Sequence, residues 1–147
     1  MEKWKTNAGV FISLPVLAIT TDEREIQMTI LSNLIVGLVA ILHLYFLAME
    51  MFLWTSAGRR AFGLTAEFAE ASKSLAANQG LYNGFLAAGL IWGIFAGTGS
   101  FEFKTFFLGC VIVAGLYGGL TVSRKFLWVQ ALPGFVALVL VLFTGKG

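Results

Sequence analysis

Long apolar stretches separated by short polar segments make up most of the chain after residue 28. Each stretch approaches the roughly 20 apolar residues that an α-helix needs to cross the hydrocarbon core of a bilayer. No stretch alternates apolar and polar residues with the period of two that is typical of a half-buried strand. The pattern therefore predicts four membrane-spanning helices, at about residues 30–54, 76–97, 105–122 and 126–144.

The connections between these stretches indicate how the helices are arranged. Only Ser123, Arg124 and Lys125 separate the last two, so these two helices must form an antiparallel hairpin. Inside a bilayer every backbone polar group must be satisfied within the protein, and four helices that run up and down are the simplest solution. We therefore expect an all-α, polytopic membrane protein, in which residues 28–147 form one domain, a four-transmembrane-helix up-and-down bundle.

The second predicted span has a long approach. Thr65 is suited to cap the N-terminus of a helix, and Glu67 falls in its first turn, where the helix dipole favours an acid. Apolar and small residues then recur at helical spacing, so we expect residues 66–78 to form a helix that lies partly in the membrane interface. Gly80 allows a bend between this helix and the span.

Residues 1–27 differ from the rest of the chain. Residues 8–19 are apolar, but this stretch contains Pro15 and leads into a charged cluster at residues 22–25. A span needs a longer apolar stretch, so we expect an N-terminal arm or an upstream extension rather than a span. Met28, directly before the first strong span, is a second plausible start of the protein.

Composition and charge support a membrane protein and suggest its orientation. The chain is 58% hydrophobic and 12% charged, with a mean hydropathy of +0.84, far outside the usual soluble range. Its net charge is only +2 and no basic stripe is present, so we expect no nucleic-acid partner. Lys and Arg favour one side of the predicted bundle, so the positive-inside rule assigns loops one and three to the cytoplasm. Loops one and three carry Arg59, Arg60, Lys73, Arg124 and Lys125, and the other side carries Arg24, Lys104 and Lys146.

Small residues recur every four positions within the predicted spans. Such ridges let helix backbones approach closely, so we expect tight bundle packing or a homodimer through the Gly-rich helix faces, with membrane lipid around them. Cys110 lies inside an apolar run and is interpreted as a small buried hydrophobic residue rather than a reactive thiol. The ridges comprise Gly80, Gly84, Gly89, Gly93 and Gly97 on the second span, and Gly115 and Gly119 on the third.

Two ionisable residues interrupt the first predicted span. His43, the only histidine of the chain, lies near the middle of the span, and Glu50 lies about 6 Å from its end at Trp54. Seven residues make nearly two helical turns, so the two side chains share one face and lie about 10 Å apart along the axis. They cannot touch, but they can bracket a ligand. Ionisable residues inside a membrane are functional-site candidates by default.

Most other polar residues of the predicted spans fall at the same end of the bundle as Glu50. The opposite half offers only Asn33 within the membrane, with Glu102 and Lys104 at its rim. A channel needs polar lining at both ends, so this asymmetry favours a cup that opens toward the cytoplasm. The candidate ligand-binding residues are Tyr45, Trp54, Asn78, Gln79, Tyr82 and Asn83.

The residue types limit the chemistry of such a cup. One His and one Glu do not supply the three or four ligands of a metal site, so we expect no metal and no cofactor. The only Asp of the chain, Asp22, lies in the arm, so we expect no hydrolytic triad. The leading hypothesis is a pocket for a small lipophilic molecule, with His43 and Glu50 as candidate catalytic acid and base. The alternatives are a small proton-coupled, multidrug-type exporter centred on Glu50, and a structural or assembly membrane protein without a ligand.

A set of motifs, in a fixed order, connects the chain to a known family. From about Met28 to the C-terminus the sequence resembles the small integral membrane proteins of domain-of-unknown-function family 1304. The resemblance implies a four-helix protein of the bacterial inner membrane with no assigned activity, and residues 1–27 lie outside it. The motifs are His43-Leu44-Tyr45 with Glu50 and Trp54, Phe62-Gly63-Leu64 with Glu67, Ala77-Asn78-Gln79-Gly80-Leu81-Tyr82-Asn83-Gly84, and Ala88-Gly89-Leu90.

Overall fold

The structure, a computed structural model, describes the backbone of residues 8–145 and the side chains of residues 23–145. Every regular element in this part of the chain is helical, which confirms the all-α prediction. The elements in chain order are α1 (Ala8–Leu47), the π-helices η1 (Ala48–Phe52) and η2 (Trp54–Gly58), α2 (Arg59–Phe62), α3 (Ala66–Ala71), α4 (Lys73–Phe95), α5 (Ser100–Thr121), the π-helix η3 (Leu127–Ala131) and α6 (Leu132–Thr144).

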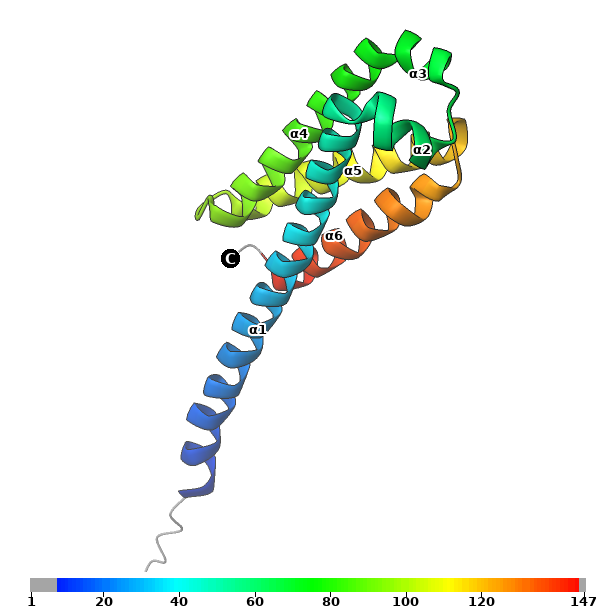
Figure 1. Ribbon diagram of the computed structural model, residues 1–147. Helices are drawn as coiled ribbons and strands as arrows, with labels where there is room; N and C mark the ends of the chain where they lie inside the picture. The colour runs from blue at the N-terminus through cyan, green and yellow to red at the C-terminus, as the bar shows by residue number, and fades with distance from the viewer. Residues whose placement is uncertain (1–7, 146–147) are drawn as a thin grey trace, which may run out of the picture.

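The long helices α1, α4, α5 and α6 enclose one hydrophobic core. Each packs against the next along the chain, and α6 returns to α1, so the four close on themselves (Figure 1). Helices α5 and α6 form the hairpin that their short connection predicts. The core residues are Val36, Val39 and Ala40 of α1, Leu90 of α4, Leu108 and Val111 of α5, and Ala137 and Val141 of α6.

Three helical segments of the described chain are long and apolar enough to cross a membrane: Glu23–Phe52, Ser100–Thr121 and Leu127–Thr144. They correspond to the first, third and fourth predicted spans and indicate a membrane protein. Helix α4 has 23 residues and is about 34 Å long, but it is not among these segments. Its N-terminal part carries Lys, Asn and Gln side chains, which lower its hydropathy.

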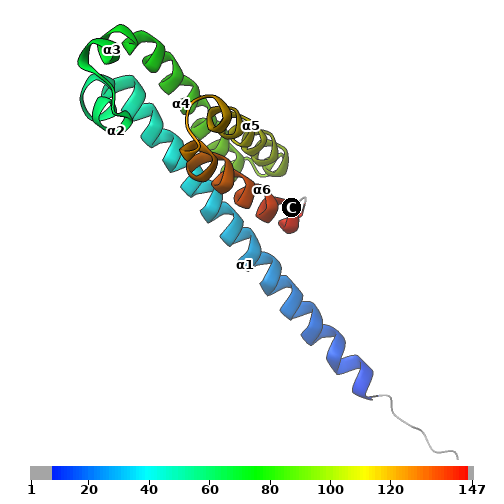
Figure 2. The ribbon, with the colours of Figure 1, turned by 90° about the vertical axis from the view of Figure 1, so that its right-hand side faces the viewer.

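Helix α1 is longer than the predicted span. It contains 40 residues, and its N-terminal part extends away from the other helices (Figure 2). Residues 8–27, expected as an arm, form the beginning of this helix, and Pro15 lies within it. Their role as a separate arm stays a prediction, and residues 1–7 and Lys146 lie outside the described residues.

The first predicted span ends in π-helix rather than in regular α-helix. The α-helical turns stop at Leu47, and Leu53, with φ −118° and ψ 13°, separates η1 from η2. Gly58 permits this tight path, because a Cβ there would lie 3.2 Å from the carbonyl oxygens of both Met49 and Leu53. Glu50 therefore lies in a π-helical turn. Such turns are rare in proteins as a whole but are frequent at functional sites.

The approach to α4 confirms one local prediction and differs from another. Thr65 caps α3, and its Oγ1 accepts a hydrogen bond from the Phe68 backbone N–H at 3.2 Å. Helix α4 is continuous through Gly80, and the break between α3 and α4 lies at Ser72. Gly80 instead allows α4 to approach the end of α1, since a Cβ there would lie 3.0 Å from the Met51 nitrogen.

Most glycines of the predicted ridges contact other helices of the same chain, but Gly97 lies in the turn after α4, with φ +57° and no neighbour within 4 Å of a Cβ. A Cβ at Gly89 would meet the ring of Phe107, and a Cβ at Gly115 would lie 2.5 Å from the Ala131 nitrogen. These ridges therefore serve close packing within the bundle, one of the two expected uses. A homodimer stays a prediction, and it would need a face other than these occupied ones.

Candidate functional site

A side-chain hydrogen bond between η1 and α4 joins two of the predicted site residues. Asn83 Nδ2 of α4 donates a hydrogen bond to Glu50 Oε2 of η1 at 2.7 Å, and it also lies 3.4 Å from the Gln79 carbonyl oxygen. Asn83 is buried and Glu50 is half-buried. Since a carboxylate acceptor strengthens a hydrogen bond, this contact fixes the Glu50 side chain against α4.

His43 lies deeper in the bundle, and its side chain is 0% exposed. Its Nδ1 lies 2.8 Å from the carbonyl oxygen of Val39, one turn earlier on α1, and its ring meets Phe46 edge-on. A carbonyl oxygen can only accept, so Nδ1 carries the proton and Nε2 of the neutral ring carries a lone pair. Nε2 has no hydrogen-bond partner among the described residues. His43 therefore offers an unused acceptor inside the protein.

The other predicted site residues do not join this group. Tyr45 and Tyr82 are 53% and 52% exposed, and the side chains of Asn78 and Gln79 are exposed as well. Trp54 donates from Nε1 to the Ser72 hydroxyl oxygen at 3.0 Å, which ties η2 to the start of α4. In the described part of the chain, no hydrogen bond links His43 to Glu50. The shared pocket predicted for these residues stays a prediction.

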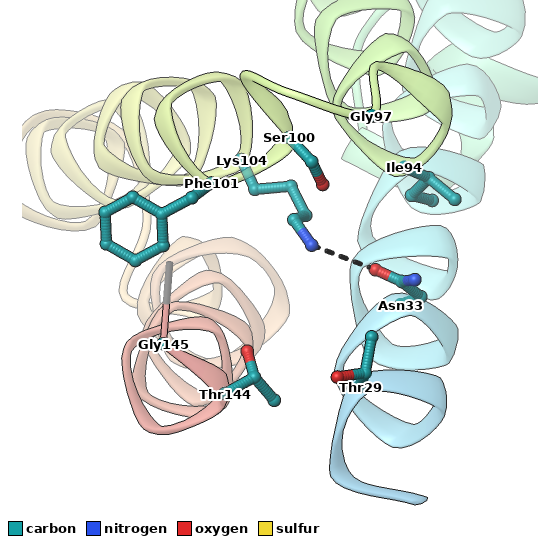
Figure 3. A pocket seen from close by; sticks show the side chains of 9 residues that line it. All are labelled: Thr29, Asn33, Ile94, Gly97, Ser100, Phe101, Lys104, Thr144 and Gly145. Atoms are coloured by element: carbon teal, nitrogen blue, oxygen red, sulfur yellow. Dashed lines mark hydrogen bonds between the residues drawn. The ribbon is translucent and has the colours of Figure 1, made fainter. Parts of the chain in front are cut away.

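Two pockets lie elsewhere on the described part of the molecule. One, of about 230 Å³, lies at the end of the bundle where α4 passes into α5 (Figure 3). The other, of about 710 Å³, is an open apolar trough along α5 between Thr105 and Tyr117, with Cys110 half-buried in its wall. Neither pocket is lined by His43 or Glu50.

Lys104 is the polar residue whose burial the sequence did not predict. It lies at the end of the bundle, as expected, but its side chain is only 6% exposed, and Nζ donates to Asn33 Oδ1 at 3.1 Å. The spacing of the buried residues of α5 contains the missed signal. Lys104 precedes Leu108, Val111 and Gly115 by four, seven and eleven residues, so it lies on the same inward face.

The charged groups around α3 and the start of α4 are exposed. The pKa of the Glu67 carboxyl lies below its usual value, because its own backbone N–H and then the Thr65 hydroxyl donate hydrogen bonds to it. Lys73 and Glu70 form an exposed ion pair at 3.5 Å, which contributes little to stability. Among the described residues, no group of three or more His, Cys, Asp or Glu side chains is positioned to hold a metal ion.

The comparisons with known proteins agree with the motif resemblance. The family described as "Protein of unknown function (DUF1304)" matches residues 37–142. The chain belongs to the DUF1304 family. The uncharacterized protein YpaA of Lactococcus lactis subsp. lactis (strain IL1403) is 35% identical over 115 residues, which cover 76% of this chain and 97% of that relative. No solved structure matches the chain.

Glu50, His43 and Lys104 are buried or half-buried polar groups of different chemistry within the region that matches DUF1304. Glu50 provides a carboxylate held by an amide, His43 an imidazole with an unused acceptor, and Lys104 an ammonium beside a pocket. None of these three side chains forms the hydrogen-bonded pair of a nucleophile and a general base that covalent catalysis uses.

Proposed function

We propose that this DUF1304 protein is a polytopic protein of the bacterial inner membrane, in which α1, α4, α5 and α6 all cross the bilayer. Helix α4 has 23 residues, close to the 22 of α5, and it packs between α1 and α5, so its neighbours can shield the buried Asn83 from lipid. The bias of Lys and Arg assigns the Glu50 end to the cytoplasm. A reporter fused at the C-terminus tests this orientation, since a cytoplasm-dependent reporter active there would reverse it.

We propose further that the protein binds a small lipophilic molecule at His43, with Glu50 as the second polar group of the site. The observation that supports this is the Nε2 atom of His43, which is buried and has no partner among the described residues. A buried polar atom without a hydrogen bond costs about 1–3 kcal/mol, so a ligand that donates a hydrogen bond to Nε2 recovers that free energy. The proposed ligand is apolar in bulk and carries an O–H or N–H group.

The single histidine of the chain makes this proposal directly testable. Protein labelled with ¹⁵N-histidine, carrying an affinity tag without histidine, gives an NMR spectrum of His43 alone. We expect 1-decanol, which has an O–H donor, to move the Nε2 resonance toward its hydrogen-bonded position. Methyl nonyl ether, which can only accept, should leave it unchanged. Equal responses to both probes, or a response to neither, would contradict the proposal.

Two variants separate binding at His43 from general effects of decanol on the membrane helices. His43→Phe fills a similar volume without an acceptor, so the rise in unfolding temperature that decanol causes should disappear. Ser74→Ala removes a hydroxyl from an exposed side chain of α4, so the rise should persist. If both variants respond as the unmodified chain does, decanol acts elsewhere and His43 is not the site.

The competing exporter hypothesis makes a different demand on the molecule. A proton-coupled exporter of cations has to carry its substrate past both ends of the bundle, and the end opposite Glu50 holds the buried ammonium of Lys104. A buried positive charge repels a cation strongly, because the low dielectric of the interior screens it little. The structural or assembly hypothesis differs again, since it expects His43→Gln to change stability alone.

A further inference from the structure

The 230 Å³ pocket is built by segments that lie far apart in the sequence (Figure 3). Its polar wall comes from Thr29 and Asn33 of α1, Ser100 and Lys104 of α5, and Thr144 of α6. These side chains meet only because the four long helices close into a bundle. The pocket shares no residue with the His43 site, so a ligand bound in it is independent of the proposed function.

Lys104 supplies the charge of this pocket. Its ammonium has three N–H donors, and Asn33 Oδ1 accepts one of them. The one ion pair among the described residues joins Lys73 to Glu70, so no described carboxylate neutralises Lys104. Burying a charge is costly unless it is paired, and Lys104 is 6% exposed. A negative group in the pocket would therefore lower the free energy of the folded chain.

The remaining polar groups show which kind of negative group fits. The hydroxyls of Ser100 and Thr144 donate to the backbone carbonyls of Gly93 and Val141, at 2.7 and 2.9 Å, and so do not contribute donors. The backbone N–H of Ser100 is also used, because it donates to the Gly97 carbonyl oxygen at 3.0 Å. Donors remain on Lys104, on the Asn33 amide and on the Thr29 hydroxyl, and the first turn of α5 adds the backbone N–H groups of Phe101 and Glu102. No side chain caps the N-terminus of α5, and its partial positive charge favours an anion.

We propose that this pocket binds an oxyanion, a phosphate group, and that the Lys104 ammonium forms its ion pair. The pocket has a volume of about 230 Å³ and is partly open, so a phosphate group can enter it while the rest of the molecule lies outside. The phosphate belongs either to a soluble molecule or to the headgroup of an anionic lipid, since the chemistry that recognises it is the same.

The experiment uses the full chain, purified in a neutral detergent and freed of lipid. Inorganic phosphate is titrated by calorimetry against chloride at equal ionic strength. In a second arm, the unfolding temperature is compared between nanodiscs of phosphatidylcholine alone and nanodiscs that also contain phosphatidylglycerol. Lys104→Met keeps the length of the side chain and removes its charge. Replacing a buried charge by an apolar chain is often neutral or stabilising, so this variant should fold.

Lys73→Met is the matched control, because it removes the same charge from an exposed position, where 62% of the side chain is accessible. The unmodified chain and Lys73→Met should respond equally, and Lys104→Met should lose at least about tenfold in affinity. A response to inorganic phosphate identifies a soluble anion, and a response to phosphatidylglycerol alone identifies the headgroup. The inference is wrong if the unmodified chain responds to neither, or if Lys104→Met responds as strongly as Lys73→Met. Lys104→Arg retains the charge and should retain the response.

Discussion

Two glycines of α5, Gly109 and Gly115, test the packing of the bundle, because the same substitution meets opposite surroundings at the two positions. A Cβ at Gly115 would lie 2.5 Å from the nitrogen and 2.9 Å from the Cα of Ala131. These are backbone atoms that cannot rotate away, so η3 and the start of α6 would have to shift. A Cβ at Gly109 would have no neighbour within 4 Å.

The magnitude is obtained by comparing the two alanine variants with each other. Replacing glycine by alanine inside a helix contributes about 0.5–1 kcal/mol in favour of folding at either position, so this contribution cancels in the difference. Forcing a methyl group into a packed interface costs about 1–3 kcal/mol. Gly115→Ala should therefore be less stable than Gly109→Ala by about 1–3 kcal/mol, since only the first carries the packing cost.

Thermal unfolding of the two purified variants in the same detergent measures this difference. A difference of 1 kcal/mol lowers the unfolding temperature of a chain of this size by about 2–4 °C. The oligomeric state of each variant is measured alongside, because the α5 face that carries Gly109 is open and a dimer could use it. Equal unfolding temperatures for two monomeric variants would refute the close approach of α5 to η3.

The remaining predictions concern the polar contacts. Asn83→Leu leaves the Glu50 carboxylate without its donor and should lower the free energy of unfolding by about 1–3 kcal/mol. The double variant Asn83→Leu, Glu50→Leu should lower it less, because no polar group is left unpaired. A double-mutant cycle measures this coupling. Thr65→Ala should destabilise α3 by about 0.5–2 kcal/mol, seen as faster amide exchange. The pKa of the Glu67 carboxyl is lower in the folded protein than in the unfolded chain. The ionised carboxylate therefore stabilises α3 at pH values above the pKa of the unfolded chain. This stabilisation is lost as the pH falls through the pKa of the folded protein. Thr65→Ala should weaken that pH dependence of exchange, and an unchanged dependence would show that the Thr65 hydroxyl does not act on Glu67.

The features that the sequence predicted correctly are set by local rules or by the bilayer. Three helical segments long and apolar enough to cross a membrane occur where spans one, three and four are predicted. The hairpin of α5 and α6 follows from a connection too short for any other path, and the cap of α3 follows from Thr65. The family followed from ordered motifs, which the match over residues 37–142 confirms.

The features that the sequence did not predict depend on contacts between distant segments. The π-helical turns around Glu50 require Gly58 to close against carbonyl groups five and nine residues earlier, which apolar periodicity does not reveal. At the break at Ser72, the Trp54 side chain donates to the Ser72 hydroxyl oxygen from another helix, a contact that local sequence does not reveal. Gly80 looked like a hinge because its contact with the backbone at Met51 is made only in the folded chain.

Lys104 shows which coordinate matters for a polar residue near the end of a membrane helix. Its position along the helix predicted the rim of the bundle, but that position determines only how far the side chain must reach for water. The face of the helix on which the residue lies decides whether its side chain points toward lipid or toward other helices. Lys104 lies on the face that also carries Leu108 and Val111, and it is buried. Glu102, two residues earlier, is turned by about 200° around the same helix and is exposed. The helical period separates these two charges, and only the inward one requires an opposite charge that the described chain does not supply.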